Sequence, residues 1–251
     1  MSSSWTRAIV VGASSGIGAA LARRLSRQGC RLALVARRED ALLALVAEIG
    51  SAAGDPGRAR AYAHDVTSAP DIPALFQRIC RDLGGLDLII YSAGVMPPVA
   101  EDEYAFEKDR QIIEVNVLGA MAWLNEAAQR FARAGEGTIV GISSVSGDRG
   151  RRGQPAYCAS KAALDTYLEA LRNRLRRRGV TVVTVKPGPV DTPMSQGVER
   201  RPLLISADRA AELILAAARR RAVMAYVPPA WRPIMFALRR IPSLVFSRLD
   251  V

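Results

Sequence analysis

The chain has 251 residues, 49% of them hydrophobic, so it can bury a sizeable core as one large domain or two small ones. The formal charge is +11, almost entirely from arginines that are spread over amphipathic helical patterns, which argues against a nucleic-acid partner. One histidine excludes a histidine-based metal cluster, and three scattered cysteines without a C-x-x-C pair suggest neither a disulfide framework nor a zinc site. We therefore expect no metal.

The N-terminal residues lack the basic and apolar regions of a signal peptide, and no run of about 18 apolar residues suggests a transmembrane helix. Together with the unpaired cysteines, these features predict a cytoplasmic protein.

The first predicted elements are a buried strand over residues 8–11, a glycine-rich turn and a helix over residues 19–28. Such a turn presents backbone N–H groups to a phosphate at the helix N-terminus. Its spacing, G-x-x-x-G-x-G, differs from the common dinucleotide fingerprint, but its place between strand and helix favours nucleotide binding over a plain turn. The expected cofactor contacts at this turn are Gly12, Ser14, Ser15, Gly16, Ile17 and Gly18.

The second predicted strand covers residues 31–36 and is followed by Arg37 and Arg38. Folds that prefer NAD place an acidic residue here to hold the ribose 2′-OH, whereas arginine attracts a 2′-phosphate. The alternative is that both arginines are simply solvated at the start of a helix, a position that disfavours cations unless an anion is nearby. We predict NADP as the cofactor in preference to NAD.

The rest of the chain alternates between strand and helix. The expected helices cover residues 39–49, 71–83, 104–133 and 206–221, besides one around Tyr157, and the expected strands cover residues 58–64, 86–91, 137–142, 180–185 and 222–227. This order predicts a doubly wound α/β fold: a mainly parallel sheet of about seven strands with helices on both faces. Residues 1–227 are expected to form a single domain, and residues 228–251 an extension.

Polar and small residues stand where several predicted strands end. Asp65 follows the third strand and could accept a hydrogen bond from an adenine amino group, and Ser92, Ala93 and Gly94 follow the fourth. Ligands of open parallel sheets bind in the crevice at this edge. Asn116 lies in the middle of a predicted helix, where it lowers stability and so needs a packing or functional reason.

Tyr157 and Lys161 are four residues apart in a segment of helical composition, which places them on one helix face. An ammonium close to a phenol lowers the phenol pKa, so that the tyrosine can exchange a proton near neutral pH. The pair alone is weak evidence, because many such neighbours lie on solvated helices.

The ordered set of motifs resembles the short-chain dehydrogenase/reductase family over residues 6–227. Ser144 lies thirteen residues before Tyr157 and twenty-eight after Asn116, and both spacings are similar to those of the family. The motifs are Gly12-x-x-x-Gly16-Ile17-Gly18, Asp65-Val66, Ser92-Ala93-Gly94, Asn116-Val117-x-Gly119, Ser144, Tyr157-x-x-x-Lys161 and Pro187-Gly188-x-Val190-x-Thr192.

The resemblance implies four catalytic residues. Tyr157 would protonate a carbonyl oxygen, Lys161 would lower the Tyr157 pKa and hold the nicotinamide ribose, Ser144 would bind the substrate oxygen, and Asn116 would position Lys161 through a water. Ser143 is expected to be structural. Further implied cofactor contacts are Asp65, Val66, Ser92, Ala93, Gly94, Tyr157, Lys161, Pro187, Gly188, Val190 and Thr192.

Two residues depart from the family pattern. Ser92 stands where many members have asparagine, and Ser15 stands where NADP-preferring members often have a basic residue. The second departure leaves a 2′-phosphate mainly to Arg37 and Arg38, with help from the Ser14 hydroxyl.

Residues 193–205 occupy the place of the family's mobile substrate lid. An apolar side, which includes Met194, Val198 and Leu203, favours an apolar ketone or aldehyde. Residues 228–251 form short apolar blocks interrupted by prolines and arginines; they are compatible with contact to a neighbouring subunit, to the substrate cleft or to the inner face of the membrane. Family analogy implies a homodimer or homotetramer. The competing hypothesis is a non-catalytic dinucleotide-binding or scaffold protein, since a fold alone does not determine activity.

Overall fold

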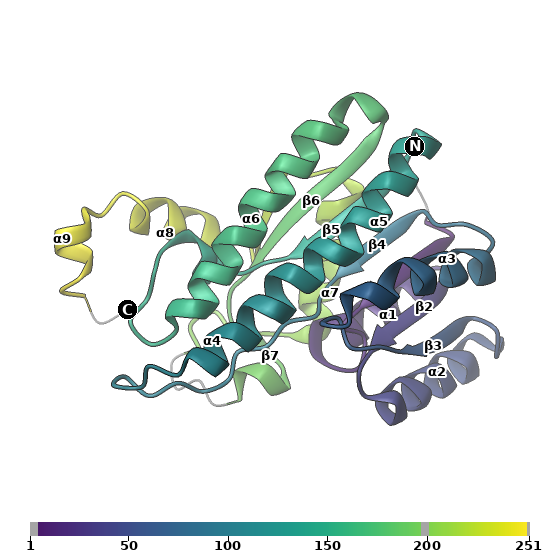
Figure 1. Ribbon diagram of the computed structural model, residues 1–251, viewed down its shortest axis with the longest axis horizontal. Coiled ribbons are helices and arrows are strands. Elements are labelled where there is room, and N and C mark those ends of the chain that lie inside the picture. Colours follow the sequence, from purple (N-terminus) through teal and green to yellow (C-terminus); the bar gives the residue numbers. More distant parts are fainter. Residues whose placement is uncertain (1–4, 197–200, 250–251) are drawn as a thin grey trace.

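A computed structural model describes residues 5–196 and 201–249. Its centre is a seven-stranded sheet in the order β3-β2-β1-β4-β5-β6-β9, in which every neighbouring pair is parallel (Figure 1). The doubly wound fold is therefore confirmed. The strands are β1 (Arg7–Val11), β2 (Arg31–Ala36), β3 (Ala59–Ala63), β4 (Leu88–Tyr91), β5 (Gly137–Ile142), β6 (Val180–Pro187) and β9 (Met224–Val227).

Helices cover both faces of the sheet, so the strands bury their side chains alternately into two cores. Val10 of β1 packs into one core, and Ile9 and Val11 pack into the other. The first core is closed by α1 (Gly16–Arg27), α2 (Glu39–Ala53) and α7 (Ala207–Arg219), and the second by α3 (Ile72–Leu83), α5 (Gly119–Ala134) and α6 (Pro155–Leu175).

Two helices differ most from their predicted bounds. The expected end of α2 at Gly50 is wrong, because Gly50 is buried inside the helix, and the chain instead turns at Gly54 in a left-handed conformation (φ +61°). The long helix expected over residues 104–133 contains α4 (Phe106–Ile113), one π-helical segment (Glu114–Leu118) and α5. The π-helical segment contains Asn116.

The C-terminal segment, residues 228–249, follows β9 and contains the short helices α8 (Trp231–Leu238) and α9 (Ser243–Phe246). Trp231 and Met235 pack against Val145 in a third, small core. The Arg149 guanidinium donates hydrogen bonds to three carbonyls around the end of α8, at 2.8 to 3.5 Å. The C-terminal segment is thus held against the turn that follows β5 (Figure 1).

A separate pair of two-residue strands, β7 (Val190–Asp191) and β8 (Ile205–Ser206), joins the two ends of the expected lid. Within the described residues, no helix combines the length and apolar character needed to cross a membrane. The three cysteines, Cys30, Cys80 and Cys158, are free thiols in buried positions.

Candidate active site

A cavity of about 630 Å³ opens along the carboxyl ends of β1, β2, β4, β5 and β6. This edge is where open parallel sheets bind their ligands. Most residues that the sequence assigned to the site line this cavity: Gly12, Ser14, Ser15, Gly16, Ile17, Arg37, Arg38, Val66, Ser92, Ala93, Gly94, Ser144, Tyr157, Lys161, Pro187, Gly188, Val190 and Thr192.

The glycine turn forms one end of the cavity because its backbone packs too closely for side chains. Gly12 has φ +87°, and a Cβ there would lie 2.4 Å from the Ala93 nitrogen. A Cβ on Gly18 would lie 2.1 Å from the Gly12 carbonyl oxygen. Gly18 therefore lies behind the lining, where it lets α1 approach the turn, and the start of α1 at Gly16 faces the cavity.

The two arginines after β2 have different partners. Arg38 Nη2 donates to Ser14 Oγ at 3.0 Å and to Ser15 Oγ at 2.7 Å, so this guanidinium lies over the glycine turn. Arg37 Nη1 is 3.7 Å from Asp65 Oδ2, and Asp65 is not among the residues that line the cavity. Arg38 therefore lies against the glycine turn, while a carboxylate offsets part of the Arg37 charge.

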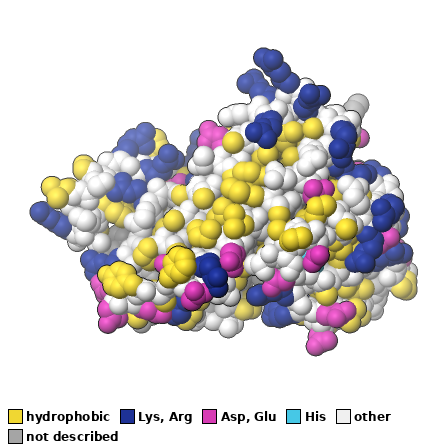
Figure 2. All heavy atoms as spheres, viewed as in Figure 1, with side chains coloured by type: hydrophobic (Ala, Val, Ile, Leu, Met, Phe, Trp, Pro, Cys, Tyr) yellow, Lys and Arg dark blue, Asp and Glu magenta, His cyan; other side chains and the backbone are white. Residues whose placement is uncertain are grey.

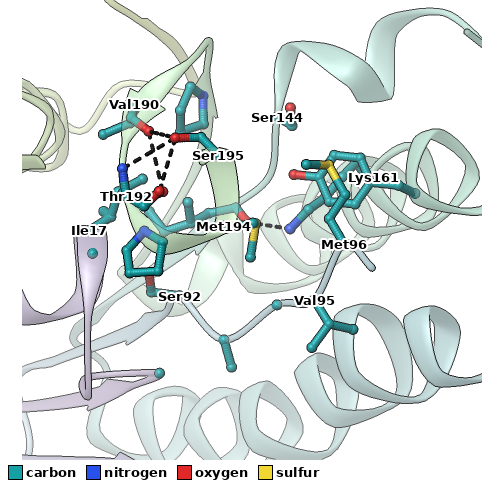
Figure 3. A pocket seen from close by; sticks show the side chains of 18 of the residues that line it. Ile17, Ser92, Val95, Met96, Ser144, Lys161, Val190, Thr192, Met194 and Ser195 are labelled. Carbon is teal, nitrogen blue, oxygen red and sulfur yellow. Dashed lines mark hydrogen bonds between the residues drawn. The ribbon is translucent and has the colours of Figure 1, made fainter. Parts of the chain in front are cut away.

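Ser144, Tyr157 and Lys161 meet at the middle of the cavity, and all three are buried. Ser144 is the second residue after β5 and caps a 3-10 turn, Val145–Asp148, whose Ser146 N–H donates to Ser144 Oγ at 3.1 Å. Lys161 Nζ donates to the Ile142 carbonyl at 3.1 Å and lies 5.5 Å from the centroid of the Tyr157 ring. In Figure 3, Ser144 and Lys161 face the hydrogen-bonded group of Val190, Thr192 and Ser195 across the cavity.

Burial dominates the protonation of this group in the polypeptide. It raises the pKa of Tyr157 to about 12, and the Ser144 hydroxyl acts in the opposite direction. It lowers the pKa of Lys161 to about 8, opposed by the charge of Asp165. At neutral pH the phenol is protonated and the amine is mostly an ammonium. The lowering of the Tyr157 pKa by Lys161 stays a prediction for the complex with a cofactor.

Asn116 is fully buried behind the cavity wall. Its Oδ1 accepts from the Val95 N–H at 2.8 Å, and its Nδ2 donates to the Val95 carbonyl and to Ser160 Oγ, both at 3.1 Å. Ser160 Oγ in turn donates to the Tyr157 carbonyl at 2.8 Å. These hydrogen bonds give the packing reason for an asparagine in the middle of a helix, because they connect the loop after β4 to the helix of Tyr157. Its link to Lys161 through a water stays a prediction.

Ser143 donates its hydroxyl to the Lys161 carbonyl at 3.2 Å, the kind of structural contact expected of it. Sequence reasoning missed Met96, Val145 and Trp231, which also line the cavity. The indole of Trp231 occupies the space beside Gly188, where a Cβ would lie 1.9 Å from Nε1. Of the three roles left open for residues 228–251, contact with the cleft therefore has a structural basis. The only feature of the sequence that pointed to Trp231 was an aromatic residue shortly after two prolines.

The expected lid is described only in part. Pro193–Ser195 forms a 3-10 turn, and Met194, Arg201 and Pro202 line the cavity. Val198 and the charged Glu199 and Arg200 lie outside the described residues.

The family model for short chain dehydrogenases matches residues 6–202. The chain belongs to the short-chain dehydrogenase/reductase family. It is 38% identical over 192 residues to an uncharacterized oxidoreductase of Myxococcus xanthus, covering 76% of this chain and 75% of that one. It is 32% identical over 243 residues to one of Mycobacterium tuberculosis, covering 96% and 95%. A solved variant of actinorhodin polyketide ketoreductase with NADPH shares 29% identity at a TM-score of 0.79, covering 90% of this chain and 97% of that one.

Members of this family are oxidoreductases that bind a nicotinamide cofactor, and the cavity fits such a group. The glycine turn leaves a space that side chains would fill. Gly94 also leaves space beside Asn116 Oδ1 and Lys161 Nζ: a Cβ built on Gly94 would lie 3.3 Å from the first atom and 3.6 Å from the second. Gly12, Gly16 and Arg38 would hold the phosphate-containing end, and Lys161 the ribose next to the reacting ring.

Proposed function

We propose that the protein is an NADP(H)-dependent oxidoreductase that transfers a hydride between nicotinamide and a carbonyl or alcohol substrate, an apolar ketone or aldehyde. The observation that supports this most is the convergence of Ser144, Tyr157 and Lys161 in the cavity that begins at the glycine turn. A binding protein would need the glycine turn, but it would have no use for a buried hydroxyl, phenol and ammonium around the same space.

The nicotinamide, when bound, supplies or accepts the hydride. The chain supplies the proton: in reduction, the Tyr157 hydroxyl gives it to the carbonyl oxygen, and Ser144 Oγ donates a hydrogen bond to the same oxygen. The ammonium of Lys161 stabilises the phenolate that remains, because opposite charges at close range favour the ionised phenol. In oxidation the same phenolate takes the proton back.

Arg38 supports NADP as the preferred cofactor, since its guanidinium already lies over Ser14 and Ser15 and can meet a 2′-phosphate without rearrangement. The apolar substrate is supported by the cavity wall beyond the catalytic group, which Met96, Val145, Met194 and Trp231 line.

Turnover by the Tyr157→Phe variant tests the enzyme against the scaffold hypothesis. With NADPH and a panel of ketones and long-chain aldehydes, we expect wild-type oxidation of NADPH and a loss of about 100- to 10,000-fold in the variant, the usual contribution of a general acid. Binding of NADPH, followed by its fluorescence, should be retained. Equal turnover by the two proteins would contradict the role of Tyr157, and absence of turnover by both would favour the scaffold.

A homodimer or homotetramer through α5 and α6 is the proposed assembly. Figure 2 shows hydrophobic side chains gathered over these helices and arginines along the margins of the same face. Leu118, the last residue of the π-helical segment before α5, is 54% exposed, and Phe106 of α4 is also exposed. Leu118→Glu should shift the sedimentation coefficient towards the monomer, whereas an unchanged value would place the interface elsewhere.

Peripheral contact with an anionic membrane is the proposed role of the outer side of the C-terminal segment. Residues 228–249 include four arginines and no acidic residue. Basic segments with apolar side chains can bind in the membrane interface. The exposed apolar side chains are Ile234, Phe236, Leu244, Val245 and Leu249. The variant Phe236→Glu/Leu244→Glu should lose co-sedimentation with phosphatidylserine vesicles while Trp231 stays in place; equal binding by the wild type and this variant would contradict membrane contact through these side chains.

A further inference from the structure

A buried lysine outside the catalytic group holds two carboxylates. Lys186 Nζ lies 2.5 Å from Asp148 Oδ1 and 2.8 Å from Asp165 Oδ2. The Lys186 and Asp148 side chains are 4% and 2% exposed, and that of Asp165 is 13% exposed. The Tyr226 hydroxyl adds a hydrogen bond to Asp148 Oδ2 at 2.8 Å.

Each charged group belongs to a different segment of the candidate active site. Asp148 closes the 3-10 turn that Ser144 begins. Asp165 lies one helical turn after Lys161 on α6, and therefore on the same face. Lys186 immediately precedes Pro187 and Gly188, which line the cavity. A single ammonium thus joins the segments that contain the hydroxyl, the phenol–amine pair and the cofactor-side loop.

Stability alone is a poor reason for such a group. Removing charges from water costs nearly as much as their attraction returns, so well-packed hydrophobic residues often serve a fold as well or better. A lysine between two carboxylates differs from apolar packing, because one ammonium that donates a hydrogen bond to Asp148 and pairs with Asp165 at 2.8 Å fixes the separation of the two acids. The arrangement therefore specifies a geometry more than it adds stability.

The same group affects the charge around Lys161. Its two carboxylates and one ammonium leave a net negative charge beside the helix of Lys161 if both acids are ionised. The groups that face Lys161 are Tyr157 and Asp165 from its own helix, Ser144 from the turn after β5 and Asn116 from the π-helical segment, with Lys186 and Asp148 behind Asp165. Asp165 is the acid whose charge favours the ammonium form of Lys161.

We propose that Asp148, Asp165 and Lys186 are positioning residues for the reaction proposed above: they hold the Ser144 turn, α6 and the Pro187–Gly188 loop in one register. This inference rests on the proposed function for its kinetic consequence only. In the proposed reaction, the three side chains contact neither substrate nor cofactor, and they act through Ser144 and Lys161.

The decisive variant, Asp148→Asn/Asp165→Asn/Lys186→Met, removes all three charges of this group together, so none of the three side chains is left as an unpaired ion. Its melting temperature should stay within a few degrees of the wild-type value, and its Kd for NADPH should change less than threefold. Its kcat should fall about 100-fold, the loss that a misplacement of about 1 Å can cause. The single variant Lys186→Arg, which keeps all three charges, should lose less kcat than the triple variant.

The matched control breaks an ion pair of equal length at the opposite edge of the sheet. Arg7 Nη2 lies 2.5 Å from Asp87 Oδ1 at the amino ends of β1 and β4. Arg7→Met should lower the melting temperature and leave kcat and its pH profile unchanged. A neutral triple variant with wild-type kcat would overturn the proposal, as would one that loses NADPH binding and thermal stability in proportion to its activity.

A second measurement is independent of turnover. The chain has only three lysines, so carbon-13 labelling of their side chains gives a spectrum in which Lys161→Met identifies Lys161. The single variant Asp165→Asn should make Lys161 lose its proton at a lower pH than in the wild type. An unchanged titration would contradict the coupling even if the variant were inactive. If wild-type protein oxidises no NADPH with any carbonyl, the proposed function fails while this coupling can still be confirmed.

Discussion

Replacing Arg38 by alanine tests the proposed preference for NADPH and should shift it towards NADH. The Arg38 guanidinium already lies within hydrogen-bond distance of Ser14 and Ser15 at the glycine turn. In the wild type it can meet a 2′-phosphate there, and NADH has no phosphate at that position. The substitution should therefore weaken NADPH and leave NADH nearly unaffected.

The size of the effect follows from charge and exposure. Two unit charges 4 Å apart attract by about 1 kcal/mol in water and about 4 kcal/mol near a protein surface. Arg38 is exposed, so we take about 2 kcal/mol, between these values, which corresponds to a factor of about 30. Arg37 faces Asp65 at 3.7 Å, and this carboxylate offsets part of its attraction for a phosphate, so we expect Arg37→Ala to cost about 1 kcal/mol or less, which is about fivefold at most.

The assay is the ratio of kcat/KM for NADPH to that for NADH, measured in wild type, Arg38→Ala and Arg37→Ala at two salt concentrations. We expect the ratio to fall about 30-fold in Arg38→Ala and the difference to shrink in high salt. An equal loss with both cofactors would mean that Arg38 supports the turn instead of reading the phosphate. A larger effect at Arg37 would refute the assignment of the two arginines.

Three further predictions concern the cleft and its stability. Trp231→Ala removes a buried aromatic side chain and should cost about 3–5 kcal/mol of unfolding free energy in a denaturant titration, whereas Phe236→Ala, exposed on the same helix, should change it little. Gly188→Ala places a Cβ against the Trp231 indole and should cost about 1–3 kcal/mol of unfolding free energy. The Gly188→Ala/Trp231→Ala variant should be more stable than the sum of the two separate losses predicts, because the added Cβ no longer meets the indole. Strict additivity of the two losses would contradict the contact. Burial lowers the pKa of Lys161 from 10.5 in the unfolded chain to about 8 in the folded one. Between pH 8 and 10.5 the unfolded chain therefore binds more protons than the folded chain, so the free energy of unfolding should rise with pH in this range. Lys161→Met should abolish this rise, and an identical pH dependence in both proteins would contradict the prediction.

The sheet and the glycine turn could be predicted because they depend on local pattern. Apolar runs such as residues 137–142 are typical of the buried strands of a parallel sheet, and the chain order of strand and helix leaves few topologies. The bounds of α2 were harder to predict, because glycine ends a helix only where a left-handed turn is required. Gly50 packs close to Pro56, a tertiary contact that no local pattern contains.

The site could be predicted as a set of residues but not as a set of partners. Nothing in the sequence distinguishes Arg37 from Arg38, since their roles depend on where the Asp65 carboxylate lies after folding. Trp231 is 74 residues after Tyr157 (231 − 157), and its place beside Gly188 depends on the docking of the C-terminal segment. Contacts between residues so far apart in the sequence depend on how this particular chain packs, whereas the ordered motifs identify only the family.

The buried thiols give the protein three natural reporters of local opening. Cys30 precedes β2, Cys80 lies on α3, and Cys158 directly follows Tyr157, so each belongs to a different region. Burial raises the pKa of all three thiols, that of Cys30 to about 12, which keeps them unreactive while their regions stay closed. The rate at which a thiol reagent labels each cysteine therefore measures the opening of that region in the native chain, without any introduced probe. Protection of Cys158 by a bound nucleotide or carbonyl compound would report ligand binding at the helix of Tyr157 even before a substrate is known.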